Sequence, residues 1–350
     1  MTRLKAAVIG AGWWGAASHI PTLAGRPEVQ LDGVCRLGPE ELERVRAHFG
    51  FAFASQDYRD VLARRPDIVV VASPHHLHHR HASDALEAGA HVLVEKPMTL
   101  DPHEAWDLVA RARRLDRHIL VCNPYQYLPH VANLRRLLTS GEAVGTIESI
   151  ACSFVSVTRA VFAGAEGLSK WKTTFFRPER STWQDPAQGG GFAYGQLSHA
   201  LPLMLWLTGL RPRQVAARTV DHEGVDLCDA ASVRFEGGAV GTIQGAAAMP
   251  EGHRTLMRLV VSGSDGVALI EFDRDSCEIR RHDGRLLAPV VLADEWAVDS
   301  SRPTHALVDL ALGRGVNASP GEVGATSVAL IEAMLRAAKG GPVDIEGMDP

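Results

Sequence analysis

Two side chains of this 350-residue sequence combine acid–base chemistry with an unusual setting. Lys96 stands in "HVLVEKPMTL", at the end of an apolar run, where burial lowers a lysine pKa and fits the group for proton transfer. His199 stands in "GGGFAYGQLSHALPLMLWLTG", between three glycines and an apolar segment. Histidine titrates near neutral pH, but a histidine in such a segment can equally be a core residue. The rest of the sequence decides between a catalytic and a structural role for His199.

A glycine-rich loop near the N-terminus points to a phosphate-containing ligand. The stretch "VIGAGWWG" places Gly10, Gly12 and Gly15 after a strand pattern and before a helical one. The first glycine permits a tight turn, the second lets the backbone approach a pyrophosphate, and the third allows close packing of helix on strand. The N-terminus of the following helix attracts phosphate. We predict that this loop, including Trp13 and Trp14, binds a dinucleotide.

The end of the second predicted strand indicates which dinucleotide. NAD sites usually carry an acidic residue there, about 20 residues after the glycines, to bind the ribose 2′-hydroxyl. This chain has Arg36 in "VCRLG", and Asp32 falls in mid-strand. An arginine suits a 2′-phosphate because it offers a fixed charge and paired donors. We expect NADP(H) rather than NAD(H). The alternative is that Arg36 is a solvated surface residue and the protein uses NAD or both.

Hydrophobic periodicity divides the chain into two unlike halves. Up to about Pro124, apolar runs such as "LKAAVIG", "DIVVVAS" and "HILVCNP" alternate with helical patterns, as in βαβ units with a parallel sheet. Beyond it, strand patterns are joined by turns such as "EGGA", "SGSDG" and "HDG", which favour an antiparallel sheet. The tail returns to helix.

We therefore predict an α/β chain with three parts. Residues 1–124 form a Rossmann dinucleotide-binding domain, and residues 125–303 form an α+β substrate and oligomerisation domain with an open, mostly antiparallel sheet. Residues 304–350 form helices that pack back toward the domain junction.

Composition bounds the class of protein. Hydrophobic residues make up 46% and charged residues 22%, as in globular proteins, and the net charge of -5 argues against a nucleic-acid partner. The five cysteines show no C-x-x-C spacing, so we expect free thiols in a reducing compartment. Signal-peptide features are not visible, and no apolar run reaches the roughly 20 residues that span a bilayer. We expect a cytoplasmic protein with no membrane partner.

Taken in order, the glycine loop, "ASPHHLH", Glu95-Lys96-Pro97 and the glycine-led histidine segment resemble the Gfo/Idh/MocA family. These are NAD(P)-dependent oxidoreductases related to glucose–fructose oxidoreductase and inositol dehydrogenase, and the resemblance covers nearly the whole chain. It implies that Lys96 contacts nicotinamide and substrate and helps proton transfer, that the bond into Pro97 is cis, and that His199 is the catalytic acid/base. The residues expected at the cofactor are Gly10, Gly12, Trp13, Trp14, Gly15, Arg36, Ser73, Pro74, His75, His78, Glu95, Lys96 and Pro97.

The stretch "PHHLHHRH" raises the question of a metal site. His75 and His79 are spaced to share a helix face, but no cysteine or carboxylate joins them locally, and a metal needs several convergent ligands. We expect no metal. The stretch is better interpreted as a strand-to-helix loop at the cofactor edge, with His79 and His81 facing solvent.

The chemistry that follows is reversible hydride transfer between the nicotinamide and a secondary alcohol or ketone. The resemblance implies a sugar, cyclitol or sugar derivative as substrate, and a homodimer or homotetramer formed through the open sheet. His199 would take the hydroxyl proton, and the charge of Lys96 would stabilise the alkoxide. Two alternatives stay open: an NAD(P)-dependent glycosidase acting by transient oxidation, and a non-catalytic dinucleotide-binding regulator. Retention of both Lys96 and His199 argues against the regulator.

The chain departs from the family pattern just before His199. Family members typically carry an aspartate four residues earlier, where this chain has Gly195, followed by Gln196. Gln196 shares a helix face with His199 but cannot take a proton. The expected substrate contacts are Lys96, Tyr127, Lys172, Trp183, Gln196 and His199.

Overall fold

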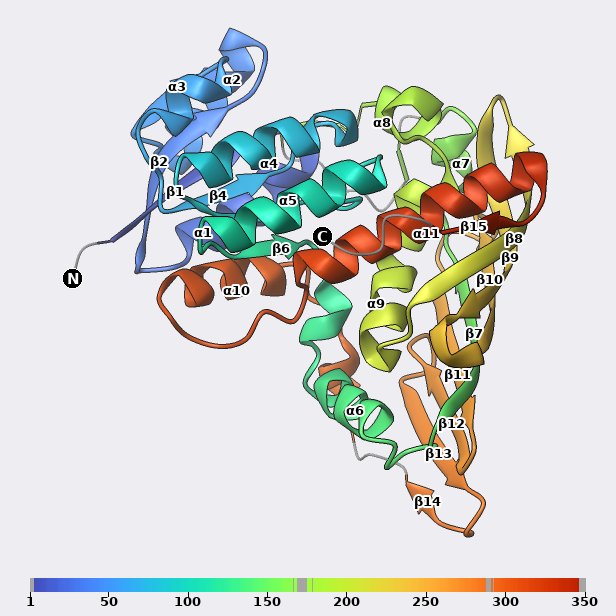
Figure 1. Cartoon of the computed structure of the whole chain (residues 1–350). Coiled ribbons are helices and arrows are strands. Elements are labelled where there is room, and N and C mark those ends of the chain that lie inside the picture. Colours follow the sequence, from blue (N-terminus) through green and yellow to red (C-terminus); the bar gives the residue numbers. More distant parts are fainter. Residues whose placement is uncertain are drawn as a thin grey trace.

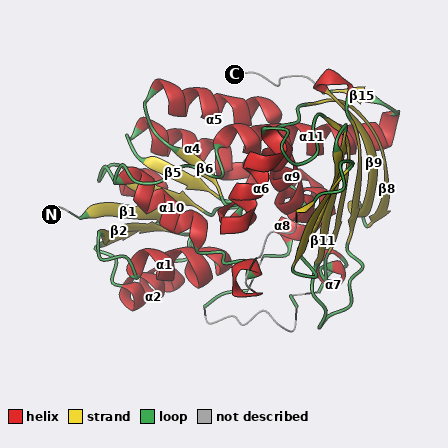
Figure 2. Cartoon of the chain, turned by 90° about the horizontal axis from the view of Figure 1, so that it is seen from below, coloured by secondary structure: helices red, strands yellow, loops and turns green. Residues whose placement is uncertain are grey.

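The computed structural model describes residues 3–165, 167–168, 175–177, 179–287, 291 and 293–345. Its strands form two sheets that stand apart, with helices between them and on the outer faces of the first (Figure 1, Figure 2). The first sheet is parallel and the second is mostly antiparallel, so the predicted fold class is confirmed. Among the described helices, none is long and apolar enough to cross a membrane.

The first sheet has six parallel strands in the order β3-β2-β1-β4-β5-β6. Its central strand β4 is the run "IVVV", which is buried on both faces because helices cover each side. The strand order reverses between β1 and β4, and ligands bind at such a switch point, beyond the carboxyl ends of the strands. The strands are β1 (Leu4–Ile9), β2 (Val29–Cys35), β3 (Phe53–Ser55), β4 (Ile68–Val71), β5 (His91–Val94) and β6 (Ile119–Val121).

Helices follow the strands of this sheet, as the alternating pattern predicts. The short edge strand β3 and the helix after it are additions that the sequence pattern did not reveal. The segment after the glycine loop begins as a π-helix, η1, before it becomes α-helical. The elements are η1 (Gly15–His19), α1 (Ile20–Ala24), α2 (Pro39–Phe49), α3 (Tyr58–Leu62), η2 (His75–Leu77), α4 (His78–Glu87) and α5 (Pro102–Arg114).

The second sheet has nine strands in the order β14-β13-β12-β11-β7-β10-β9-β8-β15. All its pairs are antiparallel except β7 with β10. Strands such as β12 alternate buried and partly exposed residues, because one face packs on helices and the other is open. The strands are β7 (Ile147–Val155), β8 (Pro212–His222), β9 (Val225–Phe235), β10 (Val240–Ala246), β11 (Leu256–Gly263), β12 (Gly266–Glu271), β13 (Ser276–Arg281), β14 (Leu286–Leu287) and β15 (Val343–Asp344).

The remaining helices follow the first sheet in the chain, and α11 connects the two parts. Helix α11 contacts α5 of the first part and α9 and β8 of the second, and α10 contacts β4, β5 and β6. Figure 2 shows α9 and α11 between the sheets. The elements are η3 (Pro124–Tyr127), α6 (Pro129–Thr139), α7 (Arg159–Phe162), α8 (Ser181–Gln184), η4 (Pro186–Gln188), η5 (Ala193–Leu197), α9 (Ser198–Thr208), η6 (Glu236–Gly238), η7 (Ala293–Trp296), α10 (Arg302–Ala311) and α11 (Gly321–Gly340).

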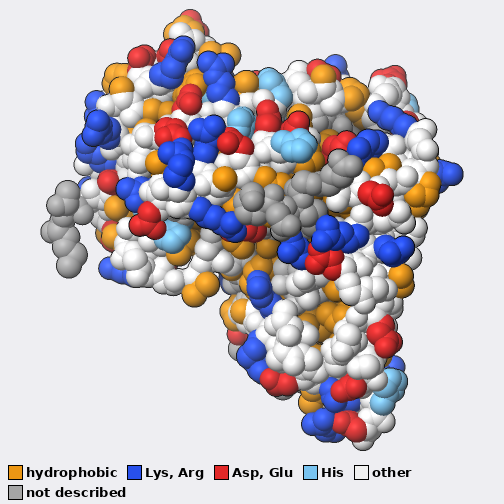
Figure 3. Space-filling view, in the orientation of Figure 1, with side chains coloured by type: hydrophobic (Ala, Val, Ile, Leu, Met, Phe, Trp, Pro, Cys, Tyr) orange, Lys and Arg blue, Asp and Glu red, His pale blue; other side chains and the backbone are white. Residues whose placement is uncertain are grey.

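Charged side chains of both signs are interspersed on the face shown in Figure 3. Ion pairs between charges of opposite sign include Arg111 with Asp107 and Arg113 with Glu322. A protein that binds a phosphate backbone would instead gather basic side chains on one face. This mixed surface agrees with the small net charge of -5.

Candidate active site

A cavity of about 1160 Å³ lies between the two sheets, at the carboxyl ends of the parallel strands. Both halves of the chain line it. The predicted site residues on its wall are Gly10, Gly12, Trp13, Trp14, Arg36, Ser73, Pro74, His75, Glu95, Lys96, Trp183, Gln196 and His199.

The structure explains why each of the three positions in this loop is a glycine. Gly10 has φ +89°, and a Cβ there would lie 2.3 Å from the backbone nitrogen of Ser73. Gly12 has no heavy atom within 4 Å of the place where a Cβ would stand, which leaves its backbone open to the cavity. A Cβ on Gly15 would lie 2.9 Å from the carbonyl oxygen of Gly10, so this glycine serves helix packing and does not line the cavity. The loop is thus shaped to let a pyrophosphate approach.

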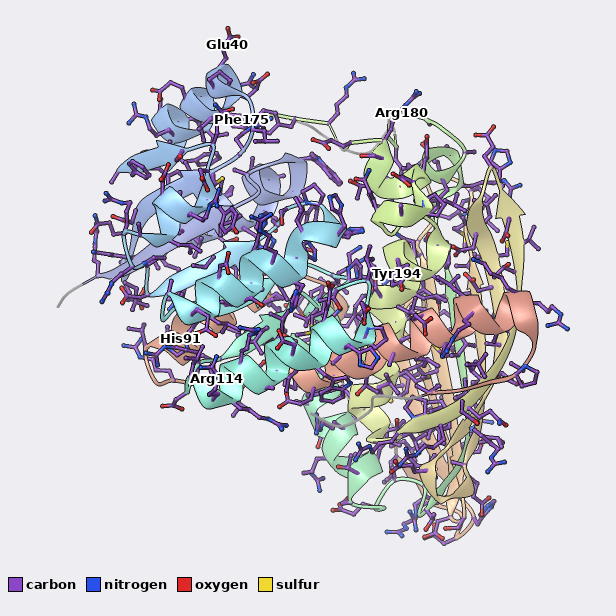
Figure 4. All side chains as sticks on the ribbon, turned by 45° about the horizontal axis from the view of Figure 1, so that its top comes forward. Glu40, His91, Arg114, Phe175, Arg180 and Tyr194 are labelled. Atoms are coloured by element: carbon purple, nitrogen blue, oxygen red, sulfur yellow. The ribbon has the colours of Figure 1, made fainter. Side chains whose placement is uncertain are left out.

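Arg36 lies at the cavity wall beyond the end of β2. Its guanidinium stacks 3.7 Å from the ring centre of Phe176 and donates to the carbonyl of Ala11 at 3.2 Å. The segment that carries Phe176 reaches across to α2, where Arg44 donates to the carbonyl of Phe175 at 3.1 Å; Figure 4 shows Phe175 beside α2. Both carboxylate oxygens of Asp32 accept hydrogen bonds from the guanidinium of Arg64, each at 2.8 Å, and Asp32 does not line the cavity.

The histidine-rich loop is more buried than its sequence suggests. His78 is fully buried, and its ring nitrogens lie 2.8 Å from the carbonyl oxygens of Ser73 and Pro97, so it ties two site loops together without lining the cavity. The expectation that His81 faces solvent was wrong: it is buried, it lines the cavity, and its Nδ1 lies 2.9 Å from the hydroxyl of Ser73. His79 is half-buried and pairs with Asp107 on α5 at 2.8 Å.

Lys96 follows β5 and enters the cavity beside a cis bond to Pro97. Its Nζ donates to the carbonyl oxygen of Gly195 at 2.9 Å, which connects the first part of the chain to the second. Burial lowers the pKa of Lys96, and the carboxylate of Glu95 opposes that shift. The hydroxyl of Tyr194 donates to the carbonyl of Leu100 at 2.8 Å and strengthens the same junction (Figure 4).

His199 is the one residue of the fully described helix α9 that keeps some exposed surface, and this half-buried side chain lines the cavity. Burial, together with the charge of Lys96, holds the pKa of His199 well below 6.5. Pro202 lacks an N–H, so the carbonyl of Ser198 needs another donor, and Asn123 supplies one at 3.0 Å. The proline therefore does not end the helix. A bond from the first part of the chain fixes α9 next to His199.

Two family patterns match most of the chain. The pattern described as "Oxidoreductase family, NAD-binding Rossmann fold" covers residues 4–122, and the GFO/IDH/MocA C-terminal domain covers residues 131–269. The chain belongs to the Gfo/Idh/MocA family. This confirms the predicted family and the predicted dinucleotide-binding fold of its first part.

Relatives within the Gfo/Idh/MocA family include oxidoreductases of known and unknown substrate. An uncharacterized oxidoreductase of Synechocystis is 30% identical over 59% of this chain and 52% of its own length. A D-glucoside 3-dehydrogenase of Escherichia coli is 31% identical over 39% of this chain and 40% of its own length. These alignments thus span about half or less of the relatives. The crystal structure of an oxidoreductase domain protein from Kribbella flavida shares the fold, with a TM-score of 0.79, 22% identity, and coverage of 99% of this chain and 100% of that one.

Gly195 stands where the resemblance to the Gfo/Idh/MocA family predicts an aspartate, and aromatic packing occupies the space. A Cβ on Gly195 would lie 3.0 Å from Cζ of Phe162 and 3.5 Å from Cζ3 of Trp183. The carbonyl of Gly195 accepts bonds from Lys96 at 2.9 Å and from Nε2 of Gln196 at 3.0 Å. The backbone carbonyl of Gly195 therefore orients Lys96. The rings of Phe162 and Trp183 fill the space that a side chain at position 195 would need.

Restoring the family residue is expected to destabilise this chain. Gly195→Asp would press a carboxylate against the Phe162 ring, and an unpaired buried polar group costs about 1–3 kcal/mol, more when it is charged. We expect the free energy of unfolding to fall by about 2 kcal/mol beyond the effect of the control Gly195→Ala, measured by urea denaturation. Equal stability of the two variants would mean that the carboxylate finds a partner, and the packing argument would fail.

Not every predicted substrate residue lines the cavity. Tyr127 lies outside it, and its hydroxyl is 2.8 Å from the hydroxyl of Ser319. Lys172 lies outside the described residues. Residues that the sequence did not single out line the cavity instead. They include Tyr125, Phe154, Ser156, Thr158, Thr255 and Ser300.

Proposed function

We propose that this chain transfers a hydride between a nicotinamide dinucleotide and a secondary alcohol or ketone of a sugar, cyclitol or sugar derivative. One observation carries the proposal: Lys96 from the first part and His199 from the second line one cavity with the glycine loop. A nicotinamide, when bound, would accept or return the hydride. The name of the Escherichia coli relative, a D-glucoside 3-dehydrogenase, supports the substrate class.

The proton chemistry follows from the two side chains. The lowered pKa keeps His199 unprotonated at neutral pH, so it is ready to accept the proton of the substrate hydroxyl. The Lys96 ammonium stabilises the alkoxide as its charge develops in a poorly solvated site. In the reductive direction the same groups return the proton and stabilise the same charge. Gln196 would orient the substrate. Its Nε2 donates to the Gly195 carbonyl, and its side-chain oxygen can accept a hydrogen bond from a substrate hydroxyl.

We further propose a preference for NADP(H), with NAD(H) as the weaker cofactor. Arg36 is the cation at the end of β2 on the cavity wall, and Asp32 is occupied by Arg64. A homodimer or homotetramer would form through the open face of the second sheet, whose outward residues on β10 include Thr242 and Gln244.

The Arg36→Ala variant tests the cofactor preference. A hydrogen bond to a charged group contributes about 1.5–3 kcal/mol, so Kd for NADPH should rise about 10- to 100-fold, whereas Kd for NADH should change little. Arg44→Ala is the matched control, because Arg44 also contacts Phe175 and Phe176 but does not line the cavity. An equal loss for both cofactors in Arg36→Ala would contradict recognition of the 2′-phosphate.

A substrate panel tests the function itself. Sugars, cyclitols and amino-sugar derivatives would be assayed with NADP and with NAD by the absorbance of the reduced nicotinamide. We expect stoichiometric reduction of the cofactor with at least one neutral polyol. Release of free sugar from a glycoside with no net cofactor reduction would instead identify a glycosidase. Cofactor binding without any turnover would favour a regulator.

A further inference from the structure

We infer that Thr304 and His19 form a buried chain that holds the Glu95 carboxylate and, through it, positions Lys96 for proton transfer. The inference rests on the proposed function of Lys96. It concerns two residues, on η1 and α10, that do not line the cavity.

His19 lies at the end of η1 with no exposed surface. Its Nε2 is 2.8 Å from Oε1 of Glu95, and its Nδ1 is 2.8 Å from the hydroxyl of Thr304, which is also fully buried. An ionised carboxylate only accepts hydrogen bonds, so Nε2 donates to Glu95, and Nδ1 is left for the Thr304 hydroxyl. Both ring nitrogens are thus engaged, and the ring is fixed in one orientation.

Glu95 connects this chain to the cavity. Its Oε2 accepts a bond from the backbone N–H of Lys96 at 3.1 Å. Burial raises the pKa of Glu95, but the hydrogen bond and charge interaction with His19 and the charge of Lys96 outweigh it and bring the pKa to about 2. The carboxylate therefore stays ionised and fixed directly beside the lysine.

Glu95 interacts with the ammonium group of Lys96 as well as with the backbone N–H of Lys96. Glu95 raises the pKa of Lys96 against the effect of burial, and the Cys122 thiol acts in the same direction. The other titratable groups that interact with this pair include His75, His78 and His199, whose pKa values burial lowers. Movement of the carboxylate would thus lower the pKa of Lys96, because the charge that opposes the effect of burial would lie farther away.

The same cluster has the composition of a metal site, but its bonding does not suit one. Ligand atoms of His19, Glu95 and Cys122 lie within 4.8 Å of one another and are buried. Both His19 nitrogens are already engaged, and burial raises the pKa of Cys122 well above 9.0, which disfavours the thiolate that a metal needs. The geometry fits a hydrogen-bonded support.

Thr304→Val tests the inference, with Thr304→Ser as the conservative control. The valine keeps the shape but leaves His19 Nδ1 without its partner, so the ring and the carboxylate lose their fixed position. We expect kcat to fall about 10-fold and KM for the cofactor to stay unchanged. A positioned acid–base group accelerates a reaction about 10²- to 10⁴-fold, and the variant would lose only part of that factor. The serine variant should retain wild-type kcat.

A second readout follows Lys96 directly. Amine labelling with acetic anhydride over a range of pH, located by mass spectrometry, gives the pH at which Lys96 becomes neutral. We expect this midpoint to shift to lower pH in Thr304→Val and not in Thr304→Ser, since a loosened carboxylate no longer raises the pKa of Lys96. A purely structural role of Thr304 would lower the melting temperature without moving the midpoint.

The outcomes separate the inference from the proposed function. If Thr304→Val keeps both kcat and the labelling midpoint, the inference is wrong, whatever Lys96 does. If a variant without Lys96 keeps full turnover, the proposed function itself is wrong. Should Thr304→Val not fold, Glu95→Gln removes the charge with the same shape, and a labelling midpoint that does not fall there would overturn the inference.

Discussion

Replacement of Lys96 by methionine is expected to lower kcat/KM by about 10³-fold, because one change removes a group positioned for proton transfer and the charge that stabilises the alkoxide. Methionine keeps most of the length of the side chain, so the cavity wall should retain its shape. The bond to the Gly195 carbonyl is lost, but the Tyr194–Leu100 bond still connects the two parts of the chain. The measurement is the initial rate of cofactor reduction with a substrate from the panel.

Two controls make this result specific. Lys339→Met changes an exposed lysine at the end of α11 and should leave kcat/KM unchanged. Cofactor Kd, followed by quenching of the fluorescence of Trp13 and Trp14 on the cavity wall, should change little in Lys96→Met. Lys96→Arg keeps the charge but cannot release a proton at neutral pH, so recovery of activity in this variant would assign the lysine an electrostatic role only. Turnover that survives in Lys96→Met would contradict the mechanism.

The sequence predicts the fold because the fold depends on local patterns. Runs such as "IVVV" in β4 are buried on both faces, and the alternation of strands with helices leaves few topologies to consider. The glycine loop is recognised from its spacing, although only Gly15 is required by a contact nearby in the sequence, with Gly10, whereas Gly10 is required by the backbone of Ser73. The three-residue strand β3 was missed because so short a segment has no measurable period.

The candidate site is less predictable because its contacts join distant parts of the chain. His19 and Thr304 are 285 positions apart, and neither stands in a motif. Tyr125 and Tyr127 both occur in "NPYQY", but the short helix η3 turns only Tyr125 toward the cavity. His81 looked like a surface residue because its neighbours are polar, whereas α4 turns it inward to Ser73. In each case the deciding fact is the direction of a side chain in the assembled fold.

Gly195 shows where sequence and structure inform each other. The sequence identifies an absent aspartate but gives no reason for it. The structure supplies one, since Phe162 and Trp183 fill the direction in which that side chain would point. Because the two rings also pack edge to face at 5.6 Å, a larger residue at this position would disturb both. His199 therefore has no carboxylate beside it in its own helix turn, and its pKa depends on burial, on the charge of Lys96 and on the opposing charge of Glu95.

The environment of His199 predicts how a His199→Asn variant would behave. Asparagine has a similar shape but cannot accept a proton, so we expect kcat for oxidation to fall about 10²- to 10³-fold, within the range of general base catalysis. The sign of the pH effect follows from the lowered pKa. The wild-type rate should stay level from neutral pH to below 6.5 and then fall as His199 becomes protonated, because only the neutral ring accepts the proton. In the variant this acid limb should disappear.

The pH profile of kcat/KM, measured with a mixed buffer of constant ionic strength, decides whether His199 is that base. His253→Asn, which changes an exposed histidine, should keep both the rate and the acid limb. A limb that persists unchanged in His199→Asn would assign the titration to another group, and His75 is the first to examine, because it lines the cavity and burial also lowers its pKa. In that case the proton would leave through the histidine-rich loop, and α9 would serve only to shape the substrate pocket.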